Sequence, residues 1–158
     1  MDLSAWLWLC LAAYAVHILE EHALNWRDWA RSVIKLPVEW SDFYVTNAVV
    51  VVLGVAAAGC VSGFPAVALG FPALMIINAI LFHIVPVIRT KGRFSPGLFT
   101  AVVLFLPLGW LTMRRALQAG VVDAAGIFLA FVIGALLMAT PIILLRIASL
   151  PYFQQDRP

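Results

Sequence analysis

The sequence carries very little charge. Only 11% of its 158 residues are Asp, Glu, Lys or Arg, whereas about a quarter of a typical soluble domain is charged. Hydrophobic residues make up 64% of the chain, which leaves too few polar side chains to cover a surface in water. Lipid must therefore surround much of the chain, and the composition predicts an integral membrane protein. The length fits a single transmembrane domain, residues 1–158, with membrane lipid as its main partner.

Several other signals are missing. The chain has no run of Lys or Arg and a net charge of only +2, which argues against nucleic acid as a partner. It has no nucleotide-binding loop, nucleophile elbow or haem-attachment motif. The two cysteines, Cys10 and Cys60, lie in apolar runs without a CxxC pattern. We interpret them as small buried residues, with a disulfide between them as the alternative. The start carries Asp2 and no basic residue, which is untypical of a cleaved signal peptide.

Long apolar runs are present, and they predict an all-α, polytopic membrane helix bundle of about five transmembrane helices. The spans are expected at about residues 3–24, 43–61, 66–88, 97–113 and 124–145. Ser41-Asp42, Ser95-Pro96 and Asp123 are suited to cap the second, fourth and fifth spans. Pro86 is expected to kink the third span because it removes one helical hydrogen bond.

The segment 25–36 differs from the spans, because its apolar and charged residues alternate with helical spacing. Trp26, Trp29 and Val33 share one face, whereas Arg27 and Arg31 lie on the other. This pattern is typical of an amphipathic helix in the membrane interface.

The basic residues predict the orientation in the membrane. Successive connections between spans lie on alternating sides of the membrane. Eight of the ten Lys and Arg residues then fall on one side, and only Arg114 and Arg115 fall on the other. The positive-inside rule then predicts a multi-pass protein of the cell membrane, with its N-terminus outside and its C-terminus in the cytoplasm.

Polar side chains within the spans gather near the cytoplasmic side of this predicted topology. His17, Glu20 and Glu21 share one face of the first span, since they stand at positions i, i+3 and i+4. Asn78 and His83 lie at a similar depth in the third span. Acidic groups inside a membrane must face protein, water or a metal ion, because exposing them to lipid costs about 2.5–3.5 kcal/mol at a helix centre.

Two functional interpretations fit this cluster. In the first, one divalent transition metal ion binds to His17, Glu20, Glu21 and His83, which are ligand types that bundle proteins use. In the second, the two carboxylates and an imidazole move protons without a metal. Neither HExxH nor HxxEH is present, so the pattern does not indicate a metalloprotease.

The plain structural interpretation differs from residue to residue. Glu20, Glu21 and His22 could lie in the headgroup region at the end of the first span, and His17 could be a core residue with a backbone partner. Asn78 alone is typical of contacts between helices. We interpret Asn47 and Thr100 as packing residues, and Ser95-Pro96-Gly97 as the cap of the fourth span.

The same residues resemble the signatures of a known family. The run His17-Ile18-Leu19-Glu20-Glu21 matches the motif that names the HXXEE-domain membrane proteins. The stretch from Asn78 to His83, followed by Phe94-Ser95-Pro96-Gly97 and Thr100, is similar to that family's second signature. The family is uncharacterised in function. The resemblance therefore implies only that His17, Glu20, Glu21, Asn78 and His83 are its characteristic polar positions.

Our leading hypothesis is a metal-dependent enzyme that acts on a lipid-soluble small molecule. Glu20 and Glu21 would act as ligands or acid/base groups, and Asn78 would orient one of the cofactor's ligands. The alternatives are a small proton-coupled or ion transporter, and a structural or accessory membrane protein. A transporter often has an inverted repeat, which this sequence lacks, although a homodimer would supply the missing half.

Overall fold

The helices of this protein form a bundle without strands, within the residues that the structure describes. The computed structural model describes residues 2–148 and residue 150. Five of its helical stretches are long and apolar enough to cross a membrane, as predicted. They are Leu3–Ala23, Trp40–Cys60, Pro65–Arg89, Leu98–Gln118 and Ala124–Ile147.

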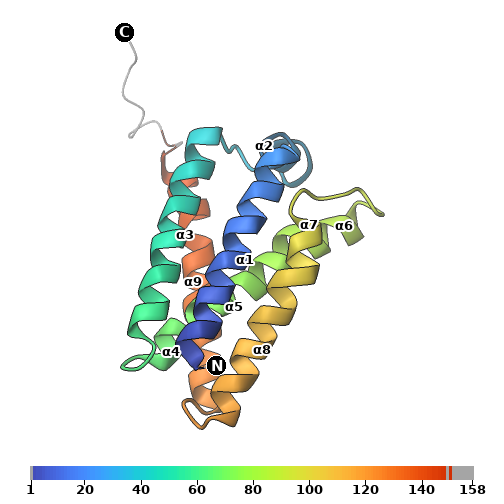
Figure 1. Cartoon of the computed structure of the whole chain (residues 1–158). Coiled ribbons are helices and arrows are strands. Elements are labelled where there is room, and N and C mark those ends of the chain that lie inside the picture. The colour runs from blue at the N-terminus through green and yellow to red at the C-terminus, as the bar shows by residue number, and fades with distance from the viewer. Residues whose placement is uncertain (1, 149, 151–158) are drawn as a thin grey trace.

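Several of these stretches are divided into shorter α-helices and π-helices, and Figure 1 labels the α-helices. The elements are α1 (Leu3–Ala23), α2 (Trp26–Trp29), η1 (Ala30–Ile34), α3 (Trp40–Cys60), α4 (Pro65–Ala68), α5 (Gly70–Asn78), η2 (Ala79–Ile84), α6 (Val85–Arg89), α7 (Leu98–Thr100), η3 (Ala101–Phe105), α8 (Leu106–Gln118) and α9 (Ala124–Ala148). The element α2–η1 is the helical segment that the amphipathic pattern predicted.

The starts of the spans confirm one predicted cap and correct two. Asp123 accepts a hydrogen bond from the amide of Gly126 at the start of α9, as predicted. The helix α3 begins earlier than expected, because Glu39 is its N-cap and forms a capping box with Asp42. The prediction that Ser95 caps the fourth span is wrong, since α7 begins after Gly97 and the Ser95 hydroxyl lies against His83 instead.

One proline in the third span and one in the fourth follow a π-helical turn. Pro86 follows η2, and Pro107 follows η3. A proline cannot donate to the carbonyl four residues earlier, and a π-turn is one way for a helix to accommodate that loss. The hydroxyl of Ser95 lies 3.4 Å from the carbonyl oxygen of Phe82, which Pro86 leaves without its helical donor. The η2 turn carries His83.

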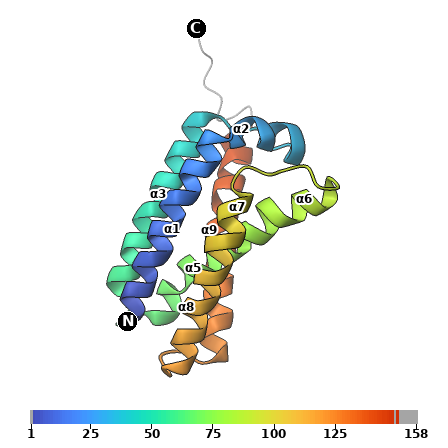
Figure 2. The ribbon, with the colours of Figure 1, turned by 45° about the vertical axis from the view of Figure 1, so that its right-hand side comes forward.

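The helix α5 lies at the centre of the bundle and packs against α1, α8 and α9 (Figures 1 and 2). Small residues let α5 and α9 approach closely, as is common between membrane helices. A Cβ atom added to Gly134 of α9 would lie 2.7 Å from the backbone nitrogen of Leu74 in α5. The two free cysteines, Cys10 and Cys60, are buried and partly buried respectively.

The helical segment α2–η1 covers the end of the bundle at which α1 finishes (Figure 1). Trp29, Ala30 and Val38 form a small buried cluster there, and Leu145 of α9 packs against it. Arg31 pairs with Glu39, just ahead of α3. This segment therefore closes one end of the bundle near the polar residues of α1.

Candidate metal centre

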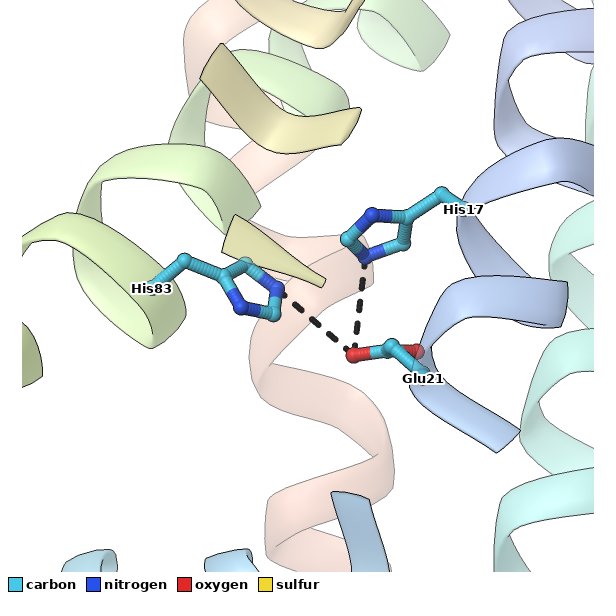
Figure 3. A group of neighbouring side chains, drawn as sticks. All are labelled: His17, Glu21 and His83. Carbon is cyan, nitrogen blue, oxygen red and sulfur yellow. Dashed lines mark ion pairs between the residues drawn. The ribbon is translucent and has the colours of Figure 1, made fainter. Parts of the chain in front are cut away.

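Three buried side chains from two spans converge on one point. His17 and Glu21 stand one turn apart on α1, and His83 comes from η2 (Figure 3). The Oε1 atom of Glu21 lies 3.5 Å from Nε2 of His17 and 3.6 Å from Nε2 of His83. The exposed fractions are 1% for His17, 5% for Glu21 and 0% for His83. One potential ligand atom from each of the three lies within 4.8 Å of the others.

A hydroxyl group holds the far side of each imidazole. Nδ1 of His17 lies 2.8 Å from Oγ1 of Thr100, and Nδ1 of His83 lies 3.1 Å from Oγ of Ser95. Both hydroxyls are buried, and both come from the short segment that starts the fourth span. Histidines that bind metals are commonly held in this way through the second ring nitrogen.

The proton on His17 depends on the Thr100 hydroxyl, which lies 3.2 Å from the carbonyl oxygen of Gly97 and 2.8 Å from Nδ1 of His17. When this hydroxyl donates to the carbonyl, its oxygen accepts from the Nδ1–H of His17, and the lone pair of His17 lies on Nε2. This atom is buried and has no hydrogen-bond partner among the described residues. A buried lone pair that faces a carboxylate oxygen is unfavourable unless a proton or a cation lies between the two atoms.

His83 has a further partner in Asn78, one π-turn earlier on the same span. The Oδ1 atom of Asn78 lies 3.0 Å from Nε2 of His83. An amide oxygen can only accept, so Nε2 of His83 carries the proton in this contact, and a metal ion at Nε2 would have to displace that proton. Asn78 is placed to orient the imidazole. The edges of the two imidazole rings also meet, with ring centroids 4.9 Å apart.

The carboxylate of Glu20 points to a different place. Its Oε1 accepts hydrogen bonds from the amides of Gly97 and Phe99, at 3.1 and 3.2 Å, and its Oε2 accepts from the amide of Thr100 at 2.8 Å. A carboxylate suits this position because the amides at a helix start lack helical partners and carry partial positive charge. Glu20 thus stands outside the group of three, although the sequence pattern placed it among the ligands.

Gly97 fits tightly between the two imidazoles. A Cβ atom at this position would lie 2.5 Å from Cε1 of His83 and 2.7 Å from Cε1 of His17. The residue also has a φ of +93°, which side chains of L-amino acids rarely adopt. The chain can therefore pass this close to the site only with glycine at position 97.

One side of the group borders a cavity of about 90 Å³. Glu21 and Asn78 contribute to its wall, together with Tyr14 and Asn47. The Tyr14 hydroxyl donates to Oδ1 of Asn47 at 2.7 Å, and the rest of the lining is mostly apolar. A small molecule in this cavity would lie next to Glu21.

The structure brings together most of the polar residues that the sequence singled out, but in three separate roles. His17, Glu21 and His83 form the group, Asn78 contacts it, and Glu20 binds the start of α7. His22 lies outside the group and packs its ring against Trp40, with centroids 5.1 Å apart. Sequence reasoning missed the contacts of Ser95 and Thr100 with the two imidazoles. Both residues belong to the second family signature, and Thr100 also lies at the same depth in its span as the other polar residues.

Comparison with protein families gives one match. A family model described as a protein of unknown function with HXXEE motif matches residues 8–112, which is well over half of the chain. No curated protein and no solved structure matches the chain. The matched range contains the group of three together with Ser95, Gly97 and Thr100.

Proposed function

Because this chain belongs to the HXXEE family, whose function is unknown, we propose a function from its site: His17, Glu21 and His83 bind one divalent transition metal ion. The observation that carries this proposal is the buried Nε2 of His17, which has no hydrogen-bond partner and faces Glu21. A metal ion between these atoms would use the lone pair of His17 and neutralise the carboxylate.

The distances support a metal ion. Nitrogen and oxygen ligands lie about 2.0–2.2 Å from zinc, so neighbouring ligands of a tetrahedral ion are about 3.3–3.6 Å apart. The two measured separations from Glu21 Oε1 to the imidazoles are 3.5 and 3.6 Å. Two histidines and one carboxylate form the ligand set of several catalytic zinc sites and of non-haem ferrous sites.

We further propose that the protein is a metal-dependent membrane enzyme with a lipid-soluble substrate. Three protein ligands leave coordination positions open, and the side of the group that carries Glu21 borders the cavity. A metal ion there supplies Lewis acidity toward a polar group of a substrate. The chain's own residues fix the imidazoles through Ser95 and Thr100 and keep the group away from bulk water.

The test is the metal content of the purified full-length protein, measured by inductively coupled plasma mass spectrometry. We expect about one first-row transition metal ion per chain in the wild type. His17→Ala, Glu21→Ala and His83→Ala should each lose it. His22→Ala is the matched control, because His22 stands on the same helix, outside the group, and this variant should keep the metal.

Two results would overturn the proposal. One is a wild-type protein that stays free of metal after reconstitution with zinc, iron(II) and manganese(II). The other is a metal that stays bound in all three variants. The first result would favour the rival functions, a proton-coupled carrier or a structural cluster, in which a proton lies between Glu21 and an imidazole.

A further inference from the structure

A groove runs along the outside of the bundle between α3 and α9. All the residues that line it come from these two helices, in the ranges 41–53 and 137–145. The groove measures about 350 Å³. Val45 and Val49 of α3 and Leu144 of α9 line it and are 65%, 53% and 58% exposed. In a protein with apolar spans, such a groove faces lipid chains.

The groove and the cavity beside the candidate metal centre adjoin each other. They share the lining residues Asp42, Thr46, Val50, Leu137, Pro141 and Leu145. Glu21 and Asn78 line the cavity but not the groove. A ligand that passes between the shared residues of α3 and α9 would therefore follow a path from the lipid-facing surface to the carboxylate that faces both imidazoles.

The sizes of the two spaces restrict what can occupy them. A cavity of about 150 Å³ is known to hold benzene, so the cavity of about 90 Å³ has room for only a few non-hydrogen atoms. A phosphate headgroup with a glycerol and two chains would not fit. The groove of about 350 Å³ can hold part of one extended hydrocarbon chain, and the remainder would lie among the lipids.

Polar groups along this path favour a ligand with an oxygen-bearing end. The polar side chains that line the cavity include those of Tyr14, Glu21, Asn47 and Asn78. Hydroxyl, amide and carboxyl groups of this kind form hydrogen bonds with a hydroxyl or carboxyl group of a ligand. Pro141 has no N–H, so the carbonyl of Leu137 lacks its usual helical donor. Both Leu137 and Pro141 line the cavity and the groove.

We infer that this path binds a single-chain amphiphile, such as a long-chain fatty alcohol or fatty acid. Its small oxygen-bearing end lies in the cavity beside Glu21, and its chain lies in the groove between α3 and α9. The inference names the substrate class of the proposed enzyme and rests on that function for what happens at the oxygen-bearing end. The chain-binding path itself depends only on the shape and lining of the two spaces.

The test is photo-crosslinking of the full-length protein in phospholipid nanodiscs. The probe is a long-chain fatty alcohol with a diazirine in the middle of its chain, and adducts are located by mass spectrometry. We expect adducts on groove residues of α3 and α9. Unlabelled fatty alcohol or fatty acid should compete with the probe, whereas an alkane of equal length should compete much less.

Two variants of α3 supply the comparison. Thr46→Trp places a large ring where the cavity and the groove meet, and the adducts in the groove should be lost. Val52→Trp adds the same ring on the same helix, at a position that is 65% exposed and lines neither space, and the adducts should remain. Size-exclusion chromatography and circular dichroism of the same samples report whether each variant is folded.

Labelling that spreads evenly over all lipid-facing helices, or that unlabelled fatty alcohol does not reduce, would overturn the inference. Adducts in the groove that persist in Thr46→Trp would also overturn it. Failure of the metal proposal would look different. The wild type would then lack metal but would still show saturable labelling of the groove.

Discussion

At the scale of single residues, the two imidazoles depend on two hydroxyls from one short segment. Thr100 holds Nδ1 of His17, and Ser95 holds Nδ1 of His83. These contacts fix the orientation of both rings, and a Thr100 hydroxyl that accepts from the Nδ1–H of His17 leaves Nε2 free to bind a cation. A sequence pattern can mark such residues as polar, but it does not tell which ring they will touch.

Thr100→Val removes the hydroxyl and keeps the shape of the side chain. Loss of a hydrogen bond behind a metal ligand typically weakens metal binding about 10–100-fold, and we expect a decrease of that size in a competitive metal titration. Thr100→Ser should restore most of the affinity, because it returns the hydroxyl. Equal affinities of Thr100→Val and the wild type would show that this hydroxyl does not support the site.

Gly97 and Gly92 form a matched pair of glycines with positive φ. Both adopt the left-handed region, at +93° and +98°, but a Cβ atom at Gly92 would meet nothing within 4 Å. Gly92→Ala should therefore lower stability by only about 1–2 kcal/mol, from backbone strain. Gly97→Ala should lower it further and abolish metal binding, because its Cβ overlaps both imidazoles.

Thermal unfolding in detergent, followed with and without added metal, distinguishes the two glycine variants. The expected order of melting temperature is wild type, Gly92→Ala, Gly97→Ala. If Gly97→Ala matched Gly92→Ala in both stability and metal content, the close approach of the chain to the imidazoles would be unimportant.

At the scale of elements, Glu20 joins the first span to the start of the fourth. Glu20→Ala leaves three amides at the start of the fourth span, those of Gly97, Phe99 and Thr100, without their acceptor. We expect a loss of about 1–3 kcal/mol in the free energy of unfolding. Glu20→Gln keeps an acceptor oxygen and should lose less. The measurement is denaturant unfolding in mixed micelles. A Glu20→Ala variant as stable as the wild type would contradict the capping role.

The five spans could be predicted from the sequence because each is an apolar run of sufficient length, and that signal does not depend on neighbouring helices. The ends of the helices were harder to predict. The fourth helix was expected to end near residue 113 but continues to Gln118, and the cation of Arg115 lies over the ring of Trp6 at 5.9 Å. Such contacts between helices decide where a helix ends, and a single sequence does not contain them.

Part of the candidate site could likewise be predicted from the sequence, and part depends on how the helices pack. His17, Glu21 and His83 could be predicted to meet because their depths in the spans agree. The different partners of the Glu20 and Glu21 carboxylates could not be predicted, because the two residues are adjacent in the sequence. It depends on how α1 is rotated toward η2 and α7, since one carboxylate faces the imidazoles and the other faces the backbone amides.

At the scale of the whole molecule, the distribution of basic residues predicts which end of the bundle faces the cytoplasm. We expect the end with α2–η1 and the loop 90–97 to be cytoplasmic. The test replaces Cys10 and Cys60 by alanine and adds one cysteine, either by Gly63→Cys or by Phe94→Cys. A membrane-impermeant maleimide on intact cells should label only the cysteine at position 63. Labelling only at position 94 would reverse the orientation.

The contact of Glu20 and His17 with the start of the fourth span also sets an order for assembly during synthesis. The first helix enters the bilayer with an imidazole and two carboxylates whose partners, from His83 to Thr100, have not yet been made. Charged groups in an isolated membrane helix are unfavourable by about 2.5–3.5 kcal/mol each at its centre. The nascent first helix should therefore stay beside the insertion machinery until residue 100 emerges, and only then be released to lipid.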